Sequence, residues 1–139
     1  TVTFNGSNTF TGGLTINAGT VGTGTATALG NGTVFLGDTT GSASATISHN
    51  LPGDRTYANN ITVRSGSSGT KSITQTTTGS TTYTGSFTLD GNLAWDLGSA
   101  ATVLKTTGVV SGNGSMTFSG SSTGTIGFGG ANTYTGGTT

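Results

Sequence analysis

Short runs in which every second residue is apolar recur along the whole chain and constrain its fold more than any other feature. Residues 61–63, 87–89 and 93–97 are clear examples, with Thr, Ala or Asp between the apolar residues. Since side chains alternate between the two faces of a strand, this period of two predicts strands with one apolar face. Gly and Asn separate the runs, as at 31–32 and 112–114, and favour turns that need a positive φ. We therefore expect an all-β protein built from many short strands.

The composition excludes several classes of function. Thr, Gly, Ser and Asn account for 87 of the 139 residues, against four Lys or Arg and four Asp. Four scattered cations are too few to bind nucleic acid. Without Cys the chain has neither a disulfide framework nor a thiolate metal site. No run of about 18 apolar residues is present, so no membrane span is expected. These observations leave no cofactor or metal to propose.

Three related motifs indicate a repeat array. Residues 8–16 read NTFTGGLTI, 82–89 read TYTGSFTL and 132–139 read NTYTGGTT. Their aromatic residues Phe10, Tyr83 and Tyr134 are 73 and 51 residues apart, so each interval must hold several shorter units. A period of about 20 residues would give roughly six or seven coils, stacked about 4.8 Å apart. We therefore expect one β-solenoid segment over 1–139, with repeat cores near 8–21, 82–93 and 132–139. A sandwich of this length would want a broader core and more regular hairpin turns, so the solenoid is the favoured architecture.

Each residue type of the motif has an expected structural role. The aromatic residues should point to one side of the strand and the flanking Thr residues to the other. The glycines that follow should allow a corner, and the Asn residues should bond turn backbone at the preceding corner. The residues concerned are Asn8, Phe10, Gly12, Gly13, Tyr83, Gly85, Asn132, Tyr134, Gly136 and Gly137.

The stretch GGANTYTGGTT at 129–139 resembles the core of the autotransporter-associated β-strand repeat, and residues 8–21 resemble that core with its usual continuation. Residues 57–63 and 109–118 are similar to stretches that flank the core in that family. The middle copy departs from the pattern, with Ser86 in place of the second Gly. The resemblance implies a right-handed parallel β-helix that is exported and displayed outside the cell, as part of a passenger or another surface protein.

Candidate catalytic residues are sparse. Glycoside hydrolysis needs two carboxyl groups about 5–9.5 Å apart, and only Asp90 and Asp96 are close in sequence. Asp96 is out of phase with Trp95 and should face solvent, whereas Asp90 precedes Gly91 and reads as a turn acceptor. His49 has no activated nucleophile nearby in the sequence, and we interpret it as a polar loop residue. The prediction is a protein without enzymatic activity.

The ends of the chain suggest a structural function. Neither end carries a charge or a Pro that would block strand pairing. We expect a secreted or cell-surface rod that acts as a filament subunit or stalk. Its partners would be copies of itself or neighbouring repeats of the same polypeptide, joined end to end. The candidate end-to-end contacts are Val2, Phe4, Ile126, Phe128 and Tyr134.

Three alternatives remain open. The chain could be a segment of a surface adhesin that binds a glycan or a host surface through a lateral face. Exposure of Tyr57, Tyr83 or Trp95 would indicate such a face. A polysaccharide-cleaving β-helix enzyme is more remote. An ice-binding solenoid is also remote, because the motif spacing is unequal.

Overall fold

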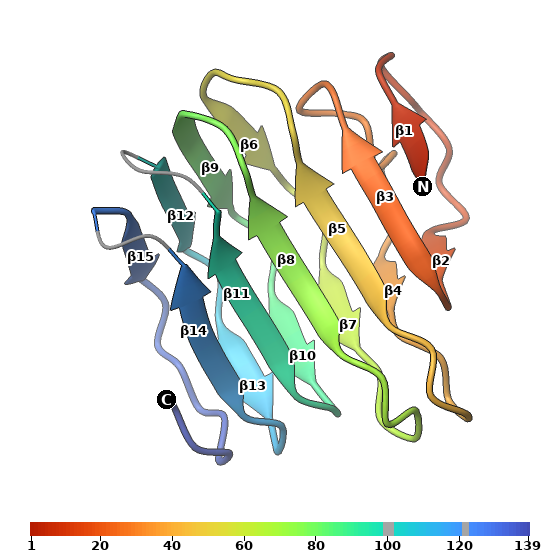
Figure 1. Cartoon of the computed structure of the whole chain (residues 1–139), viewed down its shortest axis with the longest axis vertical. Helices are drawn as coiled ribbons and strands as arrows, with labels where there is room; N and C mark the ends of the chain where they lie inside the picture. Colours follow the sequence, from red (N-terminus) through yellow and green to blue (C-terminus); the bar gives the residue numbers. More distant parts are fainter. Residues whose placement is uncertain (99–101, 121–122) are drawn as a thin grey trace.

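The computed structural model describes residues 1–98, 102–120 and 123–139 and shows a parallel β-solenoid that makes about five turns (Figure 1). The described residues form fifteen strands in three parallel sheets. The prediction of an all-β solenoid is confirmed. The N- and C-terminal segments lie at opposite ends of the stack (Figure 1).

From Ala45 onwards each turn of the solenoid passes through the sheets in the order A, C, B, whereas the first two turns have strands in sheets A and B alone. Sheet A contains β1 (Val2–Phe4), β3 (Gly19–Thr23), β5 (Ala45–His49), β8 (Lys71–Gln75), β11 (Leu93–Leu97) and β14 (Met116–Gly120). Sheet B contains β2 (Leu14–Ile16), β4 (Val34–Leu36), β7 (Ile61–Val63), β10 (Phe87–Leu89) and β13 (Val110–Gly112). Sheet C contains β6 (Arg55–Tyr57), β9 (Gly79–Tyr83), β12 (Thr102–Thr106) and β15 (Thr125–Phe128).

The coils are longer and fewer than predicted. Successive partners in the central register of sheet A are 19, 26, 26, 22 and 23 residues apart: Val2, Val21, Ile47, Ile73, Trp95 and Phe118. The prediction of six or seven coils of about 20 residues was therefore wrong. The corner from sheet B to sheet A explains much of the variation. It takes residues 37–44 and 64–70 in the two long coils, but only 90–92 and 113–115 in the next two.

The core is a narrow column of inward-facing side chains. Strands β5, β8 and β11 alternate strictly between buried and half-buried residues, as their period of two predicts. The Trp95 ring is fully buried and packs on Phe87 and Phe128, with ring centroids 5.5 and 5.7 Å apart. Because each coil is covered by the coils above and below it, two or three buried apolar side chains per strand, as in β7, β10 and β11, are enough to form this column.

Glycine is required at the corner between sheets C and B because successive coils nearly touch there. A Cβ on Gly85 would lie 2.1 Å from the carbonyl oxygen of Asn59, and one on Gly108 would lie 2.1 Å from that of Gly85. Gly130 continues the same column over Gly108. At the coil spacing set by the ladders, these positions have no room for a side chain.

The structure contains no candidate for a helical membrane span: within the described ranges no helix is long and apolar enough to cross a bilayer.

Candidate functional site

The N-terminal end of the solenoid is open. Strand β1 pairs with β3 on one side only, and the Val2 side chain is 57 % exposed. A hollow of about 420 Å³ lies at this end, between Phe4, Leu14 and Ile16 among other residues. Phe4 and Leu14 are half-buried and pack against the core. This end therefore combines a free strand edge with apolar side chains that are only partly covered.

The C-terminal end has a similar hollow. It measures about 470 Å³ and is lined by Leu97, Phe118, Gly124, Ile126 and Phe128, together with Ser119, Gly120 and Thr138. Phe118, Ile126 and Phe128 are half-buried and pack against the core. In the pairing of the described strands, β15 has β12 on one side and an open edge on the other.

The last residues of the chain partly cover this end. The N–H groups of Thr133 and Thr135 donate to the carbonyls of Val110 and Gly112, at 2.8 and 2.9 Å, so this tail runs beside β13. Tyr134 is half-buried and packs against the core. Its hydroxyl oxygen lies 2.5 Å from the hydroxyl oxygen of Thr138. Of the five predicted end contacts, Val2 and Phe4 line the N-terminal hollow and Ile126 and Phe128 line the C-terminal one. Tyr134 lies in the C-terminal tail and does not line the hollow.

Charged side chains are confined to the middle coils. All eight lie between Asp38 and Lys105, so residues 1–37 and 106–139 carry none. Charge on an edge strand is one of the usual obstacles to pairing with another chain. Both end coils are without this obstacle.

The repeat motif occupies two different places in the coil. In the first and second copies, Gly12-Gly13 and Gly85 lie at the corner that leads into sheet B, just before β2 and β10. In the third copy, residues 132–135 run along sheet B itself, and Gly136 stacks on Gly114 at the corner towards sheet A. The glycines therefore lie at corners, although not at equivalent ones.

The aromatic residues of the motif differ in exposure. Tyr83 is fully buried, Tyr134 is half-buried and Phe10 is 36 % exposed. The Phe10 ring lies across Gly30, where a Cβ would be 2.5 Å from the ring. The three aromatic side chains were expected to point to the same side of the strand. Tyr83 is enclosed in the core, whereas Tyr134 and Phe10 are only partly covered.

The Asn residues of the motif join adjacent coils. The Asn8 side-chain amide donates to the Ala28 carbonyl at 2.8 Å, and the Asn132 side-chain oxygen accepts the N–H of Val110 at 2.9 Å. Asn59, which takes the place of glycine in the corner column, donates to the carbonyls of Gly30 and Gly32. Amides at the corners therefore satisfy backbone groups of the neighbouring coil.

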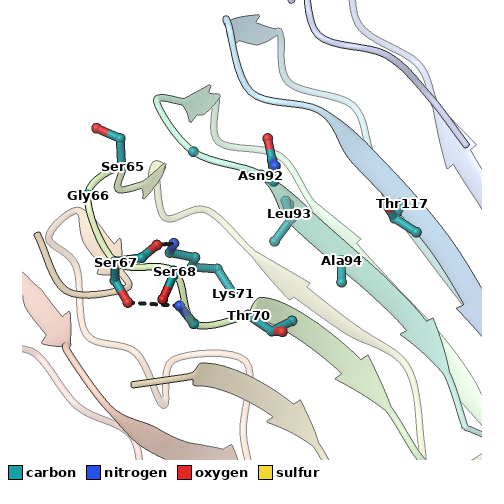
Figure 2. A pocket seen from close by; sticks show the side chains of 12 residues that line it. Ser65, Gly66, Ser67, Ser68, Thr70, Lys71, Asn92, Leu93, Ala94 and Thr117 are labelled. Atoms are coloured by element: carbon teal, nitrogen blue, oxygen red, sulfur yellow. Dashed lines mark hydrogen bonds between the residues drawn. The ribbon is translucent and has the colours of Figure 1, made fainter. Parts of the chain in front are cut away.

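A groove of mixed polar and apolar lining lies on one flank of the solenoid (Figure 2). It has a volume of about 500 Å³ and runs between the loop 65–70 and the residues Asn92, Ala94 and Thr117. The Lys71 ammonium lies in its wall, nearly buried, and donates to the Ser67 carbonyl. Hydroxyl, amide and backbone groups line the groove together with the apolar side chains of Leu93 and Ala94.

His49 belongs to a buried polar cluster, contrary to its interpretation as a loop residue. It ends β5, is fully buried, and stacks on Tyr57 with ring centroids 4.9 Å apart. Its Nδ1 lies 2.7 Å from the Thr23 hydroxyl and its Nε2 lies 2.8 Å from the Tyr83 hydroxyl. The Tyr57 hydroxyl donates to Thr23 at 2.8 Å. These four side chains come from four strands and tie three successive coils together.

Burial keeps the cluster uncharged. It lowers the pKa of His49 to about 3, with a further contribution from the nearby Arg55 guanidinium. It also raises the pKa of Tyr57 and, still more, that of Tyr83. A neutral His49 with its hydrogen on Nε2 completes one donor chain from Tyr57 through Thr23 and His49 to Tyr83.

The aromatic residues that would indicate a lateral binding face are not exposed. Tyr57, Tyr83 and Trp95 are each fully buried, so they do not give the indication of a lateral binding face that their exposure would have given. The carboxylate candidates also differ in placement: Asp90 lies in an exposed turn after β10, whereas Asp96 is half-buried on the outer side of β11. Nor do the described residues contain a group of three or more His, Asp or Glu placed to hold a metal ion.

Comparisons with protein-family models, with curated proteins and with solved structures gave no match.

Proposed function

We propose that this chain is a structural element of an extracellular rod, extended end to end by further coils of the same fold. One observation carries the proposal: both terminal coils present free parallel strand edges beside apolar hollows, and neither contains a charged side chain.

Strand edges without charge, Pro or cover are templates for another strand. Here the two ends are different surfaces, so contact between them is head to tail. Such a contact does not close on itself and produces an open filament. Burial of the half-exposed residues at each end, such as Val2 and Phe128, would stabilise the contact by about 1.5–3 kcal/mol for each side chain fully buried.

The resemblance to the autotransporter-associated repeat supports a secreted or cell-surface location. The chain has few charged residues, which suits a durable exposed rod. It has no Cys, so its stability does not depend on disulfides. The added coils would belong either to another copy of the chain or to neighbouring repeats of one polypeptide. We propose no enzymatic step for this rod.

The test is the assembly state of the isolated chain at neutral pH. Sedimentation velocity and negative-stain electron microscopy should show rods whose length increases with protein concentration. The Val2→Lys variant should prevent rod formation, because it places a charge on the free edge of β1. The Val109→Lys variant is the matched control, since Val109 is 43 % exposed and lies on a lateral corner. Particles that stay monomeric at every concentration would refute the proposal.

The flank groove favours a second candidate function, the binding of an uncharged glycan. Its hydroxyl and amide lining and its volume of about 500 Å³ would suit a short oligosaccharide. Glycan-array binding that is lost when Ser68→Trp fills the groove, and kept in Val109→Lys, would support this candidate. No binding to any glycan would remove it.

A further inference from the structure

The flank groove exists because the corner between sheets B and A changes length within the stack. This corner takes residues 64–70 in one coil and only residues 90–92 in the next. The longer corner therefore projects beyond the shorter one, and the groove of about 500 Å³ lies along the step between them (Figure 2). It lies between β8 and β11, with further coils of the solenoid on either side.

The projecting wall of the groove is held by the preceding coil. The Ser68 N–H donates to the Gly41 carbonyl at 2.9 Å, and the Ser67 hydroxyl donates to the Ala43 carbonyl at 3.1 Å. These bonds fix the loop without any contribution from a ligand. The groove is therefore largely formed in advance, as small-molecule sites usually are.

Two hydrogen-bond donors line the groove. The Lys71 stem lies across Gly37 of the preceding coil, where a Cβ would be 2.8 Å from the Lys71 Cε. The Lys71 side chain is only 6 % exposed, and its ammonium, which has three hydrogens, donates to the Ser67 carbonyl. The Asn92 side-chain oxygen accepts the Ser115 N–H at 3.0 Å, which leaves the Asn92 NH₂ group for a ligand. None of the described lining residues is Asp or Glu, so the group that completes these donors is an acceptor on the ligand.

The outer face of sheet A changes character at the groove. One outward-facing row contains, in successive coils, Thr20, Thr46, Ser72, Ala94 and Thr117. Ala94 therefore places a methyl group where the other strands have hydroxyls, and it lines the groove together with Thr117. An apolar group of a ligand can lie against this methyl without leaving a hydroxyl unpaired.

We propose that the groove binds a sugar that carries an N-acetyl group, with its amide oxygen on the Lys71 ammonium and its methyl group against Ala94. This inference rests on the second candidate function, the binding of an uncharged glycan, and names the kind of sugar. The ammonium already donates to a peptide carbonyl, so an amide oxygen is a partner of the same kind. The same ammonium repels a sugar with a free, protonated amino group.

Isothermal titration calorimetry of the whole chain with three trisaccharides tests this inference. The trimer of N-acetylglucosamine should bind about tenfold more tightly than cellotriose, which has hydroxyls in place of the acetamido groups. The protonated glucosamine trimer should bind more weakly than either of them, because it lacks the acyl oxygen and carries like charge.

The Lys71→Met variant removes the donor and keeps an unbranched stem over Gly37. It should bind the N-acetylated trimer and cellotriose equally to within about twofold. Lys105→Met is the matched control, because it removes the same charge from β12, outside the groove, and it should keep the tenfold preference. Ala94→Ser is a second variant on the outward face, where a change does not disturb the core, and it should reduce the preference about threefold.

The outcomes separate this inference from the function on which it rests. Equal affinity of the unmodified chain for the N-acetylated trimer and cellotriose would overturn the N-acetyl inference and leave glycan binding in place. A preference for the acetylated trimer that persists in both Lys71→Met and Ala94→Ser would do the same. Tighter binding of trigalacturonic acid would overturn both in favour of an acidic glycan. If no trisaccharide binds, both fall, and the rod proposal is unaffected.

Discussion

Acid should destabilise this protein through one residue, His49. The imidazole is fully buried, stacks on Tyr57 and bonds to Thr23 and Tyr83 in its neutral form. Burial, with a contribution from Arg55, lowers its pKa from 6.5 to about 3. The folded protein therefore resists protonating a group that the unfolded chain protonates readily.

The sign and size of the effect follow from linkage. Below pH 6.5 the unfolded chain binds a proton at His49, whereas the folded chain does not until about pH 3. The free energy of unfolding therefore falls as the pH falls through this window, by up to about 1.4 kcal/mol per pH unit. Between pH 7 and pH 5 the expected loss is about 2 kcal/mol. Most carboxyl groups titrate below this interval, so His49 dominates it.

Urea denaturation at pH 7, 6 and 5, followed by circular dichroism, measures this loss. The matched control is His49→Gln, which cannot titrate. We expect it to be less stable than the wild type at pH 7, because it lacks the ring that stacks on Tyr57. Its free energy of unfolding should change little between pH 7 and pH 5.

A wild-type stability that is constant from pH 7 to pH 5 would refute the reasoning. So would an equal decline in His49→Gln, because the decline would then belong to other groups. An NMR titration of the His49 ring offers a direct check, since its signal should not shift down to pH 5.

Two further predictions concern the corners and the buried hydroxyls. Gly85→Ala should lower the free energy of unfolding by more than about 2 kcal/mol, because its Cβ would lie 2.1 Å from a carbonyl oxygen; Gly6→Ala, with nothing within 4 Å, is the control and should stay within about 0.5 kcal/mol. Thermal denaturation of both variants decides this, and equal melting temperatures would contradict it. Thr81→Val should raise stability by about 1 kcal/mol, because the buried Thr81 hydroxyl has no hydrogen-bond partner among the described residues. Thr23→Val should instead lower stability by about 1–3 kcal/mol, since the hydroxyl of Thr23 serves two partners; the same sign for both variants in urea denaturation would be evidence against this account.

The alternation of apolar residues was sufficient to predict the strands, but not the number of coils. Leu93, Trp95 and Leu97 are buried as their period of two indicates. The coil length depends on corners of two to eight residues, and Gly, Ser and Thr give no fixed signal for their length. The motif containing Tyr134 shows the same limit: its sequence matches that of the first copy, yet its glycines lie at another corner.

The polar interior escaped prediction for a different reason. Ala45, Ile47 and His49 alternate as one row, so the pattern could have placed His49 inside. The row in β8 likewise buries Lys71 and Gln75 on either side of Ile73. Thr gives no such signal, because it occurs on both the inner and the outer faces of these strands. Hydrogen bonds between coils decide which polar side chains can be buried, and those depend on register.

The backbone hydrogen bonds between coils run along the axis of the solenoid. A pulling force applied at the two ends would therefore load the ladders directly and detach the coils one after another rather than all at once. Each detached coil of 19–26 residues would release on the order of 60–90 Å of chain. A solenoid of this design would yield gradually under tension and absorb work at every coil before it breaks.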